Sequence, residues 1–284
     1  MLAAVVTALL ATGCSGGAPE PGAAPESPAP ATTSVTPTPR DLPRSMAALG
    51  DSMTRAFLAC APIADCPEAS WATGSIEDVR SHRQRLAEAA GRDVEEHNLA
   101  VSGARVAGLA DQVRQAVAAR PEYVTILVGA NDACRPSEDS MTPAGEFARD
   151  FGTALDALVR GLPEARVLVA SIPDLQRLWE IGRDVDRVHQ TWERFGVCRS
   201  MLGAATDTSN AADERRRRVR ARVVAFNAAM ARACERHPTC RWDGNAVFEY
   251  DFTLAEVSDR DYWHPSREGQ RGLAEVAWRA GYWG

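Results

Sequence analysis

The chain contains no lysine, and all 32 of its basic residues are arginine. Asp and Glu together number 38, so the formal net charge is −6 and the isoelectric point is near 5.5. A nucleic-acid-binding domain normally carries a basic footprint, so we expect no nucleic-acid partner. The absence of lysine beside abundant alanine is typical of a GC-rich coding sequence, and we infer no mechanism from it.

Long apolar runs are also missing, and we therefore expect no transmembrane helix. One short run, residues 2–11, has the length of an export-signal core. It ends in Ala11-Thr12-Gly13-Cys14, which resembles a bacterial lipobox, with Ala11 at the position that prefers leucine. We therefore expect an exported bacterial protein, extracellular or held at the cell surface by a lipid on Cys14. Only that anchor would bring the chain to a membrane.

Residues 15–43 consist largely of Pro, Ala, Gly, Ser and Thr. Such a segment cannot bury enough apolar surface to offset the entropy lost on ordering, so we expect a disordered linker. The sequence therefore predicts a signal peptide over 1–14, the linker over 15–43 and one folded domain over 44–284. The chain's 45% hydrophobic content allows that domain a substantial core, and we expect a monomer.

The seven cysteines show no recognisable zinc-binding spacing, so we expect no metal site. Setting Cys14 aside as the lipidated residue leaves six, an even number that favours disulfides in an exported chain. Two pairs are close in sequence, Cys60 with Cys66 and Cys234 with Cys240. Cys134 and Cys198 would then close a longer loop, worth about 4 kcal/mol on the loop-entropy account.

Apolar runs alternate with helical patterns along the folded domain. Strands are predicted over 46–49, 94–98, 123–128 and 167–172, with a weakly marked fifth near 242–248. Helices are predicted directly after Ser52 and over 76–90, 109–119, 144–162 and 268–280, and residues 175–235 are mostly helical. This alternation indicates βαβ units and a parallel sheet. The arginine-rich stretch 215–222 is interpreted as the solvated face of a helix.

Three predicted strands end in polar or glycine-rich segments. The first ends in Gly50-Asp51-Ser52, the second runs on to Gly103, and the third is followed by Asn131. Each segment alone also fits a turn or a helix cap. Because the carboxyl ends of parallel strands share one edge of a sheet, the three together would line a single crevice.

A serine nucleophile needs a base, and His264 is the strongest candidate among the five histidines. Asp261 precedes it by three residues, close enough for its carboxylate to fix the imidazole tautomer. Asp-x-x-His pairs also arise by chance, so the spacing carries weight only together with the strand ends. His97 and His189 stay open as residues at the edge of the site.

Together these motifs resemble the SGNH hydrolases of the GDSL lipase and esterase family. The matching blocks, in family order, are Gly50-Asp51-Ser52-Met53, residues 98–103, residues 129–132 and residues 261–264. Methionine stands where the family name has leucine. Looser similarities at residues 70–71, 131–134 and 226–227 point to the phospholipase B-like and secreted bacterial lipase branch.

The resemblance implies a role for each matched residue. Ser52 would be the nucleophile, His264 the base and Asp261 its orienting acid, while the Ser52 amide, Gly103 and Asn131 would form the oxyanion hole. It also implies a flavodoxin-like three-layer α/β/α sandwich around a parallel five-stranded sheet, with no cofactor.

The function expected from this set is that of an exported serine esterase or lipase. Its substrate would be an acyl ester, of lipid or medium-chain type, because apolar residues occur in the long segments 55–75, 133–143 and 175–210. One alternative is an acetyl esterase acting on polysaccharide. Another is a non-catalytic surface lipoprotein, against which the complete set of five residues argues.

Overall fold

The computed structural model describes residues 42–60 and 63–284. The predicted signal peptide, Cys14 and nearly all of the predicted linker lie outside these residues. Five strands are described: β1 (Ser45–Gly50), β2 (Glu95–Asn98), β3 (Tyr123–Leu127), β4 (Arg166–Val169) and β5 (Cys240–Trp242). The helices are α1 (His82–Ala90), α2 (Leu109–Ala119), α3 (Ala130–Ala133), α4 (Ala144–Gly161), α5 (Leu175–Gly182), α6 (Asp186–Phe195), α7 (Arg199–Leu202), α8 (Asn210–Cys234) and α9 (Arg267–Ala280).

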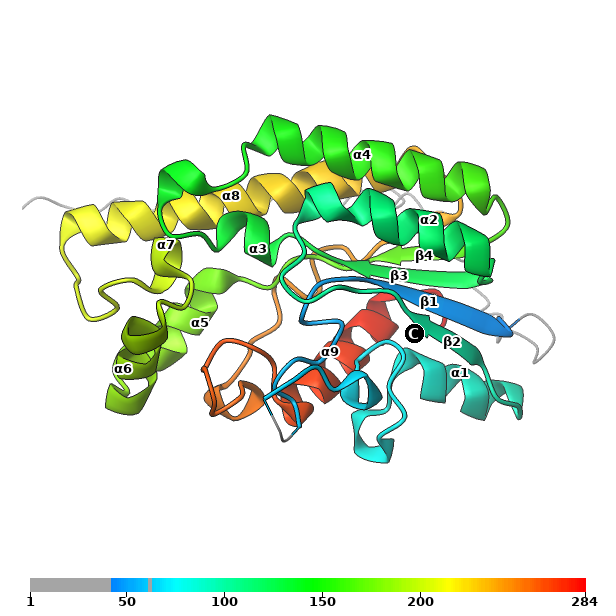
Figure 1. Cartoon of the computed structure of the whole chain (residues 1–284), viewed down its shortest axis with the longest axis horizontal. Coiled ribbons are helices and arrows are strands. Elements are labelled where there is room, and N and C mark those ends of the chain that lie inside the picture. The colour runs from blue at the N-terminus through cyan, green and yellow to red at the C-terminus, as the bar shows by residue number, and fades with distance from the viewer. Residues whose placement is uncertain (1–41, 61–62) are drawn as a thin grey trace, which may run out of the picture. The chain divides into compact units, whose positions relative to one another are not determined.

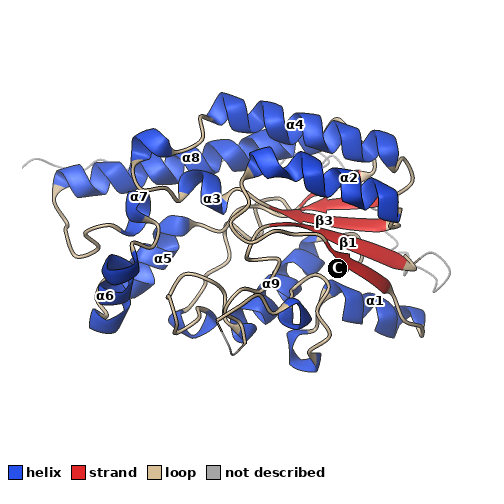
Figure 2. Cartoon of the chain, viewed as in Figure 1, coloured by secondary structure: helices blue, strands red, loops and turns tan. Residues whose placement is uncertain are grey.

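The strands form one parallel sheet in the order β2-β1-β3-β4-β5. Figure 2 shows this sheet between two layers of helices. Helices α2, α4 and α8 cover one face, and α1 and α9 cover the other (Figure 1). This arrangement confirms the predicted flavodoxin-like sandwich. Helices α5, α6 and α7 lie beyond the carboxyl ends of the strands, so the segment after β4 overhangs the sheet (Figure 1).

The sheet is buried on both faces, which explains the near-continuous apolar runs of its central strands. All five residues of β3 are buried, as are residues 46–50 of β1. Helix α4 adds Phe147 and Phe151, both fully buried, and the Phe147 ring stacks on Phe226 of α8 at 4.0 Å. This packing fixes the frame from which the polar strand ends project.

The strand predicted over 167–172 ends at Val169, and three other predicted elements differ more from the structure. Residues 51–59 form turns rather than a helix, because Ala56 and Leu58 adopt positive φ angles of 50° and 62°. The helix predicted over 76–90 begins only at His82, since Arg80 is left-handed with φ of 51°. The fifth strand ends at Trp242, where it was predicted to begin.

The arginine stretch of α8 is not simply a solvated face. The helix continues beyond this stretch, and its residues Val223 and Phe226 are buried in the core. Arg216, however, is 1% exposed, because its guanidinium lies 4.1 Å from the Trp179 ring and donates to the Ala204 carbonyl at 3.0 Å. Burial of this cation therefore depends on a ring and carbonyls supplied by the overhanging segment.

The three predicted disulfides are all present, linking Cys60 to Cys66, Cys134 to Cys198 and Cys234 to Cys240. The first clips the turn region after Ser52. The second ties α3 to the start of α7, and the third joins the end of α8 to β5. No helix of the described residues is long and apolar enough to cross a membrane.

Candidate active site

The end of β1 places Ser52 where a side chain can face the carboxyl edge of the sheet. Gly50, the last residue of the strand, has φ of +147°, and a Cβ there would lie 2.1 Å from the carbonyl oxygen of Leu127. Only glycine allows this close approach to β3. The chain can therefore turn sharply after the strand. The Ser52 residue that follows is largely buried, with 6% of its surface exposed.

The structure brings Ser52, His264 and Asp261 into one hydrogen-bonded line. His264 Nδ1 lies 2.6 Å from Asp261 Oδ2, and its Nε2 lies 2.9 Å from Ser52 Oγ. With Nδ1–H donating to the carboxylate, the Nε2 lone pair faces the serine hydroxyl and can accept its proton. The other Asp261 oxygen accepts from the N–H groups of Trp263 and His264, which fixes the carboxylate. This geometry matches the arrangement that a serine nucleophile requires.

The loop that carries the acid and base is closed by its own backbone. Ser258 N–H donates to the His264 carbonyl at 2.8 Å, and Tyr262 N–H donates to the Ser258 carbonyl at 2.9 Å. Val257 and Pro265 form an antiparallel bridge where the two ends of the loop meet. From outside, the indole N–H of Trp192 on α6 donates to the Tyr262 carbonyl at 2.8 Å. The base is thereby held by local bonds and by the overhanging helices.

Two backbone N–H groups are available for an oxyanion. Within residues 42–60 and 63–284, neither the Ser52 nor the Gly103 N–H has a hydrogen-bond partner. Gly103 has φ of +80°, and nothing lies within 4 Å of the position of a Cβ there. The open space beside it allows a substrate to approach the backbone.

The side-chain amide of Asn131 is already in use in the free protein. Its Nδ2 donates to the Ala104 carbonyl at 3.0 Å and lies 3.4 Å from Asp51 Oδ2. The second contact is long and easily broken. Contact with Asp51 places the Asn131 amide beside the residue that precedes Ser52. To donate to a substrate oxyanion, one N–H of this amide must turn away from Ala104 or Asp51.

Asp51 is a buried acid that the sequence did not single out. It is 1% exposed, and burial raises its pKa from 3.8 to about 7, against the opposing effect of the Met53 N–H, which donates to it at 2.9 Å. His264 lowers that pKa further, while the nearby Asp132 raises it. A carboxyl that titrates near neutral pH therefore lies directly behind the nucleophile.

A second buried carboxyl secures the segment around Asn131. Asp132 accepts from the Val106 N–H at 2.9 Å and from the Thr142 hydroxyl at 2.7 Å, and burial raises its pKa. Three residues after Asn131, Cys134 is bonded to Cys198. These links connect the candidate oxyanion residue to neighbouring loops and to α7.

Two buried glutamines hold the turn around Ser52, and neither is among the residues predicted from the sequence. Gln112 of α2 accepts from the Gly50 N–H at 2.7 Å and donates to the Gly50 carbonyl at 2.8 Å. Gln270 of α9 donates to the Met53 carbonyl at 2.8 Å. The only sign of such a residue in the sequence is a glutamine at a helical position where an apolar residue is expected. In α2 this glutamine comes three residues after Leu109, on the same face of the helix.

The remaining histidines do not join this line. His97 and His189 each lie 3.4 Å from a carboxylate of their own segment, Glu95 and Asp186. His82 is fully buried, and burial lowers its pKa to about 3. Among residues 42–60 and 63–284, no three His, Cys, Asp or Glu side chains cluster so that they could hold a metal ion.

A small apolar hollow lies beside the candidate triad. It has a volume of about 40 Å³ and is bounded by neighbours of Ser52 and His264 in the sequence, among them Met53 and Trp263. Leu178 of α5 and Phe252 line it as well. Segment 175–210 thus contributes as expected, whereas neither 55–75 nor 133–143 contributes a lining residue.

Seven apolar residues of the segments 55–75 and 175–210 are divided between core and surface. Trp71, Trp179, Trp192 and Met201 are buried, Phe57 and Leu178 are half-buried, and Phe195 is exposed. The Phe57 ring meets the edge of the His264 ring at 4.9 Å. Four of these seven residues are therefore core, and among the seven only Leu178 lines the apolar hollow.

Two solved structures illustrate the similarity of this fold to known proteins. LAE5, an α/β hydrolase from the metagenome of Lake Arreo, is 18% identical with a TM-score of 0.54, covering 84% of this chain and 94% of that one. An extracellular lipase from Streptomyces rimosus is 17% identical with a TM-score of 0.51, covering 84% and 99%. At these identities the likeness shows the fold alone. None of the curated proteins compared with the chain matches it.

The family is shown by a match over most of the folded part. The sequence model for the GDSL-like Lipase/Acylhydrolase family matches residues 48–271, a range that contains Ser52, Gly103, Asn131, Asp261 and His264. The chain therefore belongs to the GDSL-like lipase/acylhydrolase family and is an ester hydrolase by descent.

Proposed function

We propose that the protein is an exported serine esterase that cleaves acyl esters through Ser52, His264 and Asp261. The observation that supports this best is the line of two short contacts, 2.9 Å from Ser52 to His264 and 2.6 Å from His264 to Asp261. His264 would take the serine proton during attack and return it to the leaving alcohol. The N–H groups of Ser52 and Gly103, joined by the Asn131 amide, would stabilise the tetrahedral oxyanion.

Substitution of the triad tests the proposal. Ser52→Ala and His264→Ala should each lower kcat on p-nitrophenyl butyrate by about four or more orders of magnitude, because the triad acts as a unit. Asp261→Asn should cost less, since the other two groups remain. Circular dichroism should show an intact fold in all three variants. Turnover by correctly folded Ser52→Ala near the wild-type rate would refute the nucleophile.

The acyl group of the substrate is proposed to be apolar. The hollow beside the triad is lined by Met53, Leu178, Phe252 and Trp263, and each methylene buried there contributes about 0.8 kcal/mol. Its 40 Å³ are small, so a longer chain requires the half-buried Leu178, Phe252 or Trp263 to move. A polysaccharide acetyl group would gain little from such a surface.

A chain-length series distinguishes this proposal from an acetyl esterase. In the wild type, kcat/KM on p-nitrophenyl esters should rise from acetate toward medium chains. Leu178→Ala enlarges the hollow and should move the optimum to longer chains, whereas Phe195→Ala, an exposed position that does not line it, should leave the optimum unchanged. A steady fall from acetate onward, with acetate released from acetylated xylan, would support the carbohydrate esterase instead.

A further inference from the structure

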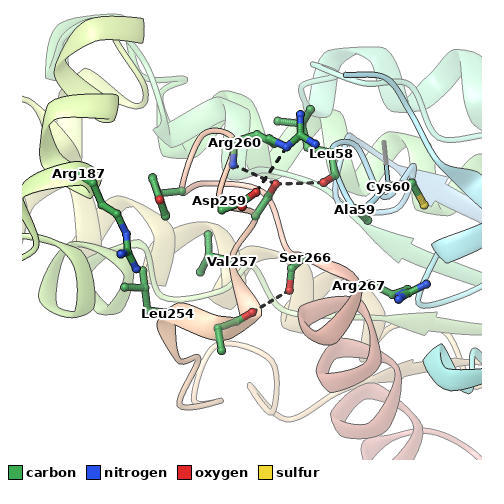
Figure 3. A pocket seen from close by; sticks show the side chains of 13 residues that line it. Leu58, Ala59, Cys60, Arg187, Leu254, Val257, Asp259, Arg260, Ser266 and Arg267 are labelled. Atoms are coloured by element: carbon green, nitrogen blue, oxygen red, sulfur yellow. Dashed lines mark hydrogen bonds and ion pairs between the residues drawn. The ribbon is translucent and has the colours of Figure 1, made fainter. Parts of the chain in front are cut away.

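A second hollow, of about 910 Å³, lies against the loop that carries Asp261 and His264 but does not include either residue. Figure 3 shows its walls, which are formed by Leu58, Ala59 and Cys60 from the turn region after Ser52, by Arg187 from α6, and by nine residues of the segment 254–267. The volume is in the range of binding sites for small organic ligands, about 300–1,000 Å³.

The charges around this hollow are mainly positive. Arg187, Arg260 and Arg267 line it, and Asp259 is the one carboxylate among the lining residues. Asp259 lies 3.5 Å from Arg260, while Asp78, outside the hollow, lies 3.5 Å from Arg267. In the described part of the chain, the Arg187 guanidinium has no ion pair. The excess of cations contrasts with the net charge of −6 for the whole chain.

The two serine side chains of the hollow are already bonded within the protein. Ser258 Oγ donates to the Leu58 carbonyl and Ser266 Oγ donates to the Ala255 carbonyl, both at 3.0 Å (Figure 3). The donors left to meet a ligand are thus mainly guanidinium N–H groups, together with the Tyr262 hydroxyl. Guanidinium groups suit phosphate, whose several oxygens accept more than one donor.

The arginine-lined hollow adjoins the apolar one beside the triad. Val257 lines both, and Tyr262 of the larger hollow lies between Asp261 and His264 in the loop. A ligand that spans the two hollows would need an apolar chain at one end and an anionic group at the other. Such a molecule is an anionic amphiphile.

We propose that the arginine-lined hollow binds the phosphate group of an amphiphilic ester whose acyl chain lies toward Ser52. The link to catalysis rests on the proposed function, whereas binding of the phosphate group does not. Each guanidinium near an anionic lipid surface contributes attraction worth about a fivefold change in affinity. Neutralising all three should therefore weaken binding by about a hundredfold.

Vesicle binding by the full chain tests this directly. A Cys14→Ser, Ser52→Ala background removes the lipid anchor and hydrolysis. The fraction of protein that sediments with vesicles is measured for phosphatidylcholine vesicles with and without phosphatidylglycerol. Two proteins are compared, the background and the background with Arg187→Gln, Arg260→Gln and Arg267→Gln added, here called the triple variant. Arg149→Gln, an exposed arginine of α4 on the opposite face of the sheet, is the matched control.

The proposal expects preferential binding to phosphatidylglycerol vesicles that the triple variant loses and Arg149→Gln keeps. Inorganic phosphate at constant ionic strength should compete if the hollow holds the ion itself. Failure to compete, with the triple variant still impaired, assigns recognition to the lipid headgroup. Equal binding by background and triple variant, or an equal loss in Arg149→Gln, overturns the proposal.

Activity separates failure of this proposal from failure of the proposed function. With Ser52 restored, the triple variant should keep the wild-type kcat/KM on neutral p-nitrophenyl butyrate. If wild-type enzyme hydrolyses that ester and no variant changes vesicle binding, only the anion site is wrong. If no ester is hydrolysed while vesicle binding behaves as expected, the catalytic assignment alone fails.

Discussion

The Asp51 carboxyl links stability to the candidate oxyanion hole at the scale of a single residue. Its pKa of about 7 lies above the 3.8 of an exposed aspartate, because burial disfavours the charged form. Between these two values the folded protein binds a proton that the unfolded chain has lost. The free energy of unfolding therefore falls as pH rises from about 4 to 7, by no more than about 4 kcal/mol from this group.

Asp51→Asn should remove this pH dependence. The difference in unfolding free energy between variant and wild type, measured by urea denaturation, should rise in the variant's favour from pH 4 to 7 and then level off. The Asp51 carboxylate has two acceptor oxygens, whereas an asparagine has one acceptor oxygen and one NH2 donor. The NH2 group would face either the Asn131 amide or the Met53 N–H, which are themselves donors, so kcat should also fall. A parallel pair of stability curves would contradict the raised pKa.

At the scale of secondary-structure elements, α6 positions the loop that holds the base. The indole N–H of Trp192 donates to the Tyr262 carbonyl at 2.8 Å, and Trp192 is 1% exposed. Tyr262 has φ of 51°, a conformation that non-glycine residues rarely adopt, so it needs support from its surroundings.

Trp192→Phe should keep most of the packing and remove this donor. We expect a stability loss of about 1–3 kcal/mol from the unsatisfied carbonyl, together with a lower kcat and a nearly unchanged KM. Trp179→Phe is the control, because its indole N–H donates at 2.8 Å to the Ala205 carbonyl, away from the base. It should cost similar stability and spare kcat, and an equal fall in kcat would assign Trp192 a merely structural role.

At the scale of the whole folded unit, the Cys134–Cys198 bond closes the longest of the three disulfide loops, with a sequence separation of 64. The loop contains α4, β4, α5 and α6, so it joins the core layers to the overhanging helices. The other two bonds each span 6 residues and constrain the unfolded chain far less.

Removing the long bridge should therefore destabilise the protein most. Cys134→Ala with Cys198→Ala should lower the free energy of unfolding by about 4 kcal/mol, and Cys234→Ala with Cys240→Ala by about 2 kcal/mol. Thermal and chemical denaturation of both double variants measure this order. A larger effect from the short bridge would show that native contacts, not loop length, determine the cost.

The sequence by itself determined the features that depend on neighbouring residues. Apolar runs followed by Gly50 or Gly129 marked the ends of buried parallel strands, and the three-residue spacing of Asp261 and His264 allowed their 2.6 Å contact. The cysteine spacings similarly indicated two short bridges and left one long one. Local chemistry was enough for these, because each signal lies within a few residues.

Only the tertiary structure decided what bonds across long separations. Gln112 accepts from the Gly50 N–H across 62 residues, and Gln270 reaches the Met53 carbonyl across 217. Arg216 is likewise buried beside Trp179, although its position in a run of arginines predicted a solvent-exposed side chain. A polar side chain is stable inside a protein only where distant segments supply its partners, and no local pattern records which segments will meet.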